Sequence, residues 1–558
     1  MFPDDTIAAI ATPLGEGGLS VIRISGKTAL AVADKVFVPV GRNSSKPGDA
    51  TSHTIHYGKV VRAGQQVDEV LCAVMRAPRT YTREDIVEIT CHGGILSTKT
   101  VLDTVLEAGA RLAEPGEFTK RAFLNGRLDL TQAEAVADLI HSRTELALSA
   151  ANEQLAGKLS QRINQLRDDL LNTLAHIEAH IDFPDEDIAP DTREKLENRL
   201  ERGIAFMDEL LRTANEGQIL RRGVRAAIVG RPNAGKSSLL NQLLGHDRAI
   251  VSPIPGTTRD TIEETANVRG IPVVFIDTAG LRQAQDDIET EGIRRSRESL
   301  ARAEFILHVL DASEPMTAED EQLLAEFTDK KRLLVRNKTD LPQRLTAEEL
   351  ERRAPPRQVP GSRRGNEAES PDEPERGGAS VPASRFSPPS PLRPGRGPTP
   401  PSPNPIGRGA GGEGIEDEMS KPFPNPDCQT DAPLTPSLSP SDGERVAKPG
   451  EGLPLIVDIS CTTGHGIETL KDAIKTLVWS GQVHGEMSQV TVNSRHQDAL
   501  RRARESTRLT LDALRADASL EFVALDLHIA VKAVGEIVGK TTTEDLLDSI
   551  FSQFCLGK

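Results

Sequence analysis

The stretch GRPNAGKSSLL, residues 230–240, constrains the fold of this chain more than any other. It matches the pattern G-x-x-x-x-G-K-[ST], and it lies between the apolar run RAAIVG and the run SSLLNQLLG, which favours a helix. In this order of strand, loop and helix, the loop amides and the helix N-terminus surround an anion. The stretch therefore predicts a phosphate-binding loop within a parallel sheet that helices cover.

The residue types of this loop suit a nucleotide. Lys236 is expected to reach the outer phosphates, and the hydroxyl of Ser237 is expected to bind Mg²⁺. The loop residues predicted to contact the nucleotide are Asn233, Ala234, Gly235, Lys236, Ser237 and Ser238.

Two segments further along identify the base. LLVRNKTD ends an apolar run in Asn337, Lys338 and Asp340, and a carboxylate at the last position can accept two hydrogen bonds from the N1 and N2 edge of guanine. Adenine has no such pair of donors, so Asp340 predicts GTP. IVDISCTTG places Ser460 and Cys461 where a backbone amide would meet the guanine O6.

Two other segments are expected to sense the γ-phosphate. VVFIDTAG ends in Asp277, Thr278, Ala279 and Gly280; the acid can hold Mg²⁺ through water, and the glycine amide can face the phosphate. VSPIPGTTRD contributes Ser252, Pro253, Ile254, Pro255, Gly256, Thr257 and Thr258, whose threonines are candidates for Mg²⁺ and phosphate contacts.

The position that carries a water-orienting glutamine in Ras-like enzymes is Leu281, which has no hydrogen-bonding atom. Another group must therefore orient the attacking water. The residues alone do not choose among the candidates in LRQAQDDIETEG, which are Gln283, Asp286, Asp287 and Glu289.

Composition limits the class of protein. A chain of 558 residues has room for about three domains. Its net charge of −16 excludes a whole-chain electrostatic footprint for nucleic acid, so contacts with RNA must depend on local basic patches. The five cysteines show no CxxC spacing, and no apolar run is long enough to cross a bilayer. We expect a soluble, cytoplasmic protein with no membrane contact.

The pattern of the chain predicts four consecutive regions. Residues 1–125 mix short β-rich runs with one helical run and predict an α+β domain. Residues 126–217 are helical, and residues 218–480 form the α/β nucleotide domain. Within the latter, about 352–452 are rich in Pro, Gly and Ser and predict a disordered insertion. Residues 481–558 are helical again and are expected to pack against the earlier helices.

Local signals within the helical regions are more detailed. Thr131 with Glu134, and Thr541 with Glu544, have the spacing of a capping box. Apolar residues from Leu155 to Ile181 recur every three or four positions and predict a single long helix with one apolar stripe. Pro184 is expected to break that helix, and a second helical stretch should end near Glu216.

Several stretches together resemble the tRNA-modifying GTPase family MnmE. They are DTIAAIATPLGEGGLSVIRISG, YTREDIVEITCHGG, EPGEFTKRAFLNGRLDLTQAEAVADLI, IDFPDED, PGTTRD, DTAGLR and FCLGK. The resemblance covers nearly all of the chain outside the insertion. It implies a multidomain α+β and α/β fold in which a folate-binding-like domain is followed by a helical domain that carries an inserted Ras-like P-loop GTPase domain.

The resemblance also implies roles in GTP hydrolysis. Asn233, Ser252, Ile254 and Thr257 match potassium ligands, and Ser237 and Thr258 match magnesium ligands. Glu289 matches a glutamate that orients water indirectly, which would explain Leu281. Members of the family hydrolyse GTP when two G domains dimerise.

For the amino-terminal domain, the resemblance implies a site for formyl-tetrahydrofolate. Arg23, Glu88 and Lys558 match folate-contacting residues, and Arg127 takes the place of a lysine, which preserves charge but changes geometry. Cys555 matches a carboxy-terminal cysteine with a role in the modification.

By this resemblance, the protein is a homodimer that works with the flavoprotein MnmG, in an expected heterotetramer, on the C5 position of the wobble uridine of certain tRNAs. One alternative is a ribosome-assembly GTPase that acts as a binding switch, although the GxxG loop of a KH domain is not found. Another alternative is a membrane-remodelling GTPase, which no basic amphipathic face supports.

Overall fold

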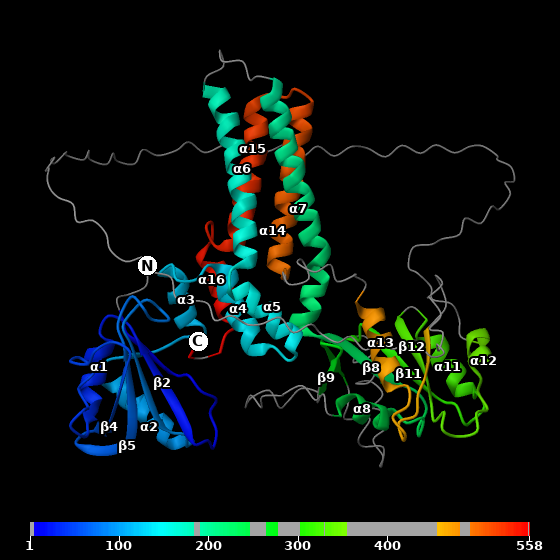
Figure 1. The fold of residues 1–558 in the computed structure, drawn as a ribbon, viewed down its shortest axis with the longest axis horizontal. Coiled ribbons are helices and arrows are strands. Elements are labelled where there is room, and N and C mark those ends of the chain that lie inside the picture. The colour runs from blue at the N-terminus through cyan, green and yellow to red at the C-terminus, as the bar shows by residue number, and fades with distance from the viewer. Residues whose placement is uncertain are drawn as a thin grey trace, which may run out of the picture. The chain divides into compact units, whose positions relative to one another are not determined.

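The computed structural model describes residues 5–182, 190–245, 264–276, 302–328, 330–353, 455–479, 492–555 and 557–558 (Figure 1). The expected break at Pro184 lies outside these residues. So does the expected insertion, except for Arg352 and Arg353, which are the last residues of helix α12 (Ala347–Arg353). Within the described part of the chain, no helix combines the length and the apolar character that a membrane crossing needs.

The amino-terminal part is a mixed α+β structure, as predicted. Its seven-stranded sheet has the order β3-β4-β5-β6-β2-β1-β7. Adjacent strands are antiparallel, except that β1 and β7 are parallel. The strands are β1 (Ile7–Ile10), β2 (Leu19–Ser25), β3 (Phe37–Pro39), β4 (Thr54–Arg62), β5 (Gln65–Met75), β6 (Ile86–His92) and β7 (Arg111–Leu112). The apolar sides of α1 (Ala29–Val36) and α2 (Ile95–Glu107) share one core with the sheet, and α3 (Glu117–Leu124) follows.

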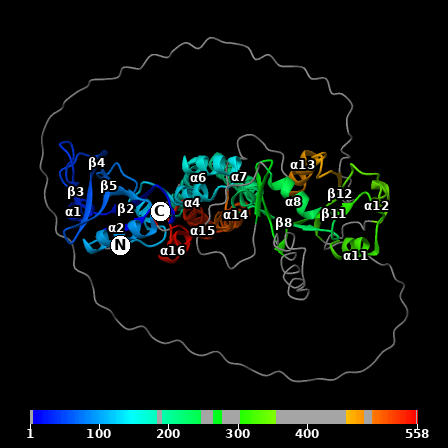
Figure 2. The same ribbon diagram turned by 90° about the horizontal axis from the view of Figure 1, so that it is seen from below.

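Four long helices share a second core. They are α6 (Lys158–Asp182), α7 (Pro190–Arg222), α14 (Ser494–Arg515) and α15 (Leu520–Val538), and they lie side by side in Figures 1 and 2. The stripe on α6 consists of Leu159, Ile163, Leu166, Leu170, Leu174 and Ile177, all of them buried. These residues step by three or four positions, which places them on one face of the helix.

The predicted stripe was too long at its beginning. Leu155 is the last residue of a separate helix, α5 (Glu145–Leu155). Gly157 then takes a φ of 88°, a conformation that ends helices, and α6 begins at Lys158. At the other limit of the helical region, α7 continues to Arg222, six residues beyond the predicted end near Glu216.

Both predicted capping boxes were wrong by two residues. Helix α4 (Leu130–His141) is capped by Asp129, whose carboxylate accepts from the amide of Gln132, and the Gln132 side chain accepts from the amide of Asp129. Aspartate followed three residues later by glutamine serves the same purpose as the predicted pair. Similarly, Thr543 rather than Thr541 caps α16 (Glu544–Phe551).

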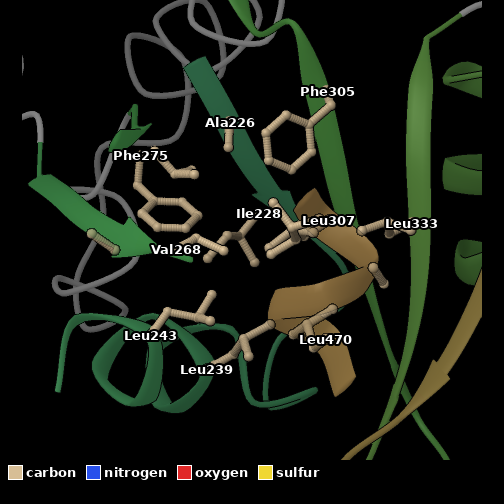
Figure 3. Packing of buried hydrophobic residues seen from close by; sticks show 14 of the residues in the cluster. Ala226, Ile228, Leu239, Leu243, Val268, Phe275, Phe305, Leu307, Leu333 and Leu470 are labelled. Atoms are coloured by element: carbon tan, nitrogen blue, oxygen red, sulfur yellow. The ribbon is translucent and has the colours of Figure 1, made fainter. Parts of the chain in front are cut away.

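The third part is a six-stranded sheet in the order β13-β12-β11-β8-β10-β9. Adjacent strands are parallel, except that β9 (Glu264–Val268) and β10 (Ile271–Phe275) pair antiparallel. The other strands are β8 (Val224–Val229), β11 (Phe305–Asp311), β12 (Lys331–Asn337) and β13 (Leu455–Asp458). Helices α8 (Lys236–Leu244) and α13 (Ile467–Val478) contribute Leu239, Leu243 and Leu470 to its core (Figure 3). The remaining described helix of this part, besides α12, is α11 (Ala318–Glu326).

A single glycine joins the helices to this sheet. Only Gly223 separates the end of α7 from the start of β8. Its φ is 74°, and a Cβ atom there would lie 2.9 Å from the carbonyl oxygen of Pro272. Residues with side chains rarely adopt this backbone conformation, so glycine is required on both counts.

A buried ion cluster ties the two helical segments together. Arg495 at the start of α14 donates to Glu134 of α4 over 2.9 Å, and the His496 ring lies 2.8 Å from the other carboxylate oxygen. Arg495 also donates to the carbonyl oxygens of Glu536 and Ile537, so its charge is well satisfied. Burial alone would raise the pKa of Glu134, but these two partners hold that pKa below its usual value.

We predict that Glu134→Gln destabilises the protein by about 3 kcal/mol at pH 7, because it leaves the Arg495 charge buried without a counterion. The pKa of Glu134 is lower in the folded protein than in the unfolded chain, so its stabilising effect is complete above about pH 4.5 and is lost progressively as the pH falls from there towards the lower folded pKa. The difference between the two proteins should therefore shrink in acid. Urea denaturation at a series of pH values measures it.

The matched control is Asp512→Asn, which removes an exposed partner 3.8 Å from Arg508 on α14. Its denaturation midpoint should match that of the wild-type protein. Equal midpoints for wild-type protein and Glu134→Gln at pH 7 would contradict the role of the ion cluster.

Candidate functional site

The loops after four parallel strands meet at one edge of the six-stranded sheet, the usual place for a ligand in such folds. The phosphate-binding loop follows β8, and Asp311 is the last residue of β11. Residues 337–340 end and follow β12, and residues 460–461 follow β13. The fold thus brings the described parts of the predicted nucleotide site together.

The backbone of the phosphate-binding loop leaves no room for side chains at the two glycine positions of its motif. Gly230 has a φ of 148°, and a Cβ atom there would lie 2.2 Å from the carbonyl oxygen of Val309. Gly235 has a φ of 98° and precedes the first residue of α8. Asn233 also has a positive φ, 63°, which asparagine tolerates better than most residues. The loop therefore curls tightly, as the wrapping of amides around phosphate requires.

Lys236 is held inside this loop. Its ammonium group donates to the carbonyl oxygens of Gly230 and Arg231, each over 2.7 Å. Burial lowers the pKa of Lys236. A phosphate in the loop would supply the negative charge that this partly buried cation lacks.

Asn337 connects three of the loops. Its side-chain NH₂ group donates to the carbonyl oxygen of Ala234 over 2.9 Å, and its side-chain oxygen accepts from the amide of Cys461 over 3.2 Å. The residue is only 2% exposed. One buried amide therefore fixes the phosphate-binding loop relative to the ends of β12 and β13.

The residues expected to recognise guanine surround this junction. Lys338 donates to Asp311 over 2.5 Å, whereas Asp340 is exposed. Burial, with a contribution from the nearby Asp340 carboxylate, raises the pKa of Cys461 to about 11. Asp340 is thus close to Cys461 and accessible to a base. The Ser460 amide donates to the carbonyl oxygen of His465 in its own turn.

Many predicted residues lie outside the described part of the chain. They are Ser252, Pro253, Ile254, Pro255, Gly256, Thr257, Thr258, Asp277, Thr278, Ala279, Gly280, Leu281, Gln283, Asp286, Asp287 and Glu289. Ser237 and Ser238 are described and belong to the first turn of α8.

A second group of predicted residues meets in the amino-terminal part. Arg23 of β2 lies directly across from Glu88 of β6 and donates to its carboxylate over 2.8 Å. The Arg23 guanidinium also lies 5.6 Å from the centre of the Tyr81 ring and 5.7 Å from that of Phe118. It further donates to the carbonyl oxygen of Gly557 over 3.4 Å.

The last described residues of the chain lie at this cluster. Burial and the Arg23 charge lower the pKa of Lys558, and the Glu88 charge opposes them, so the amine is close to both residues. Gly557 has a φ of 88°, and a Cβ atom there would lie 2.4 Å from the carbonyl oxygen of Ile10. The exposed Cys555 lies just before them.

Arg127 reaches the same place through the aromatic ring of Tyr81. Its guanidinium lies 4.8 Å from the ring centre and donates to the Tyr81 carbonyl oxygen over 2.8 Å. A planar group can stack on the ring in this way, which a lysine ammonium cannot. Tyr81 therefore contacts both Arg127 and Arg23, and Arg23 pairs with Glu88 close to Lys558.

The sequence interpretation missed Tyr81 and Asp311. Asp311 had a signal, because it directly follows the buried run FILHVL, and a carboxylate at the end of a parallel strand is placed for function. Tyr81 lies in a loop between β5 and β6; it begins the stretch YTREDIVEITCHGG, but nothing in that stretch gives it a role. Its contacts with Arg23 and Arg127 arise only when the sheet forms.

Comparison with known proteins shows strong similarity along the whole chain. The family model "MnmE helical domain" matches residues 130–555, and the model "GTP-binding protein TrmE N-terminus" matches residues 6–127. A Geobacillus thermodenitrificans protein called tRNA modification GTPase MnmE is 40% identical over 559 residues, which cover 99% of each chain. Proteins of the same name from Geobacter metallireducens and Clostridioides difficile are 39% and 38% identical and cover 100% of each chain.

We predict that Gly235→Ala weakens guanine nucleotide binding by at least about 100-fold, or about 2.7 kcal/mol. The new Cβ atom would lie 2.0 Å from the Asn337 side-chain nitrogen, at a φ of 98° that alanine rarely adopts. Titration with a fluorescent GDP analogue measures the affinity, and circular dichroism checks the fold.

Gly41→Ala is the matched control, because Gly41 has a similar φ of 93° but no atom within 4 Å of the new Cβ position. It should carry the backbone strain without loss of nucleotide affinity. Wild-type affinity in Gly235→Ala would show that Asn337 does not constrain the loop.

Proposed function

The chain belongs to the MnmE family of tRNA modification GTPases, and on that premise we propose that it hydrolyses GTP in the course of tRNA modification. The observation that carries the proposal is the junction at Asn337. It joins a phosphate-binding loop to the loop of the exposed Asp340, which can accept from the N1 and N2 edge of guanine. The reaction takes place in the cytoplasm.

The proposed modification is at C5 of the wobble uridine of certain tRNAs, where an aminomethyl or carboxymethylaminomethyl group is added together with the flavoprotein MnmG. Formyl-tetrahydrofolate supplies the one-carbon unit. Support comes from the cluster of Arg23, Glu88, Arg127 and Lys558, in which a carboxylate can accept from a pterin N–H edge and basic groups can bind a glutamate tail. Cys555, with its exposed thiol nearby, takes part in the modification.

Mg²⁺ and K⁺ are the proposed metal ions. Ser237 and Thr258 would hold Mg²⁺, while Asn233, Ser252, Ile254 and Thr257 would hold K⁺. The described residues fit this assignment, because Ser237 lies in the first turn of α8 beside the loop and Asn233 occupies the turn of the loop itself. Bound cations there would neutralise charge that develops on the transferred phosphoryl group.

Two copies of the chain are proposed to form a homodimer, and hydrolysis becomes efficient when their G domains meet. Ras-like enzymes orient the attacking water with a glutamine, but this chain has Leu281 at that position. Glu289 takes over the role and orients the water indirectly. MnmG binds this dimer in a heterotetramer.

We predict that GTP turnover by the full-length protein is at least about tenfold faster in KCl than in NaCl, and that the rate per molecule rises with protein concentration. Asn233→Gly keeps the positive φ but removes the ligand oxygen, so its rate in KCl should fall to that in NaCl. Equal rates in the two salts at all protein concentrations would contradict both the potassium site and the dimer.

The function itself is tested by deleting the gene and analysing the nucleosides of bulk tRNA by mass spectrometry. We expect the C5 substituent of wobble uridines to disappear and to return with the wild-type gene but not with Gly235→Ala. Intact uridines together with immature ribosomal subunits would instead identify a ribosome-assembly GTPase.

A further inference from the structure

A basic pocket lies beside Tyr81 in the amino-terminal part. Its lining includes Arg79, Thr80, Tyr81, Arg83 and Arg127, and no acidic residue contributes to it. Three guanidinium groups around one hollow are notable in a chain with a net charge of −16. Such a concentration of positive charge attracts an anionic ligand.

The arginines of this pocket are positioned without being neutralised. Arg127 and Arg83 donate to the carbonyl oxygens of Tyr81 and Asn125, over 2.8 and 2.9 Å, rather than to carboxylates. Arg79 is exposed, and the contacts described for this part of the chain include no ion pair to it. All three charges therefore remain available to a ligand.

Nearby carboxylates serve other groups. Asp85 accepts from the amide of Ala77, and Glu84 accepts from Ser25 and from Arg121. Neither Asp85 nor Glu84 lines the pocket, so its lining carries three arginines and no carboxylate.

The pocket adjoins the cluster proposed to bind folate. The Tyr81 ring contacts both Arg127, which lines the pocket, and Arg23, which pairs with Glu88. A ligand held at Arg23 and Glu88 that extends past Tyr81 would therefore enter a region with three arginines.

We propose that this pocket binds the γ-linked glutamate tail of the folate, so that the protein prefers polyglutamylated folates to the monoglutamate. The inference rests on the proposed folate binding and adds Arg79 and Arg83 as residues that determine specificity. Each additional glutamate brings one more carboxylate, and guanidinium groups bind carboxylates through two parallel hydrogen bonds.

The test compares 5-formyl-tetrahydrofolate as the monoglutamate and as the triglutamate by calorimetric titration of the full-length protein. We expect the triglutamate to bind about tenfold tighter, a difference of about 1.4 kcal/mol, and the difference should shrink at high salt. Arg79→Gln should reduce the tenfold preference to about threefold, and Arg79→Gln with Arg83→Gln should abolish it. Affinity for the monoglutamate should not change.

Arg42→Gln is the matched control, because Arg42 is an exposed arginine of the same domain and does not line the pocket. It should retain the full preference. Equal affinity of the wild-type protein for the two folates, or a preference that survives the double substitution, would overturn the inference. Reduced tRNA affinity of the double variant with an unchanged folate preference would assign the pocket to RNA phosphates and overturn it as well.

Failure of the proposed folate binding gives a different result. In that case neither folate binds the wild-type protein, whereas a wrong assignment of the tail leaves monoglutamate binding intact.

Discussion

The buried carboxylate of Glu134 is the interaction on which the arrangement of the helices depends. Its partner Arg495 is 361 residues away in the sequence, beyond the whole six-stranded sheet. A carboxylate and a guanidinium are costly to bury alone and are tolerated when they are paired and fully hydrogen-bonded. The pair thus fixes where the returning chain meets α4, and α14 and α15 then complete the apolar core that α6 and α7 leave open.

A polar side chain has a similar connecting role in the six-stranded sheet. The buried side chain of Asn337 donates to the carbonyl oxygen of Ala234 in the phosphate-binding loop and accepts from the amide of Cys461 after β13. If either loop shifted alone, a buried polar group would lose its partner. A base bound next to Asp340, as proposed above, would therefore be coupled through Asn337 to the phosphate-binding loop. In this protein, buried polar groups define how separate segments meet, and apolar cores supply the bulk of the stability.

The sequence was most informative where the signal is local. The motif at residues 230–237, with the apolar run before it and the helical run after it, predicts strand, loop and helix in that order, and the stripe from Leu159 to Ile177 predicts a buried helix face because its period is that of a helix. It was less informative about boundaries. Asp129 with Gln132 and Thr131 with Glu134 both have the spacing of a capping box, but the chain uses the first pair, while Thr131 donates to Asp129 and Glu134 pairs with Arg495. Contacts between distant segments had no local signal at all: Arg23 meets Gly557 across 534 residues, and the shared contacts of Tyr81 depend on strand register.

The direct joint between α7 and β8 has a mechanical consequence. The helix has 33 residues, so it forms a rod about 50 Å long with Gly223 as its pivot. A rotation of about 5° at the pivot, transmitted rigidly, would displace the far end of the rod by roughly 4 Å. The crowding of Gly223 against Pro272 of β10 restricts the directions in which it can turn. A small rotation at the start of β8 would therefore be transmitted along the whole length of α7 and, through the core that α7 shares with α6, α14 and α15, to those helices as well.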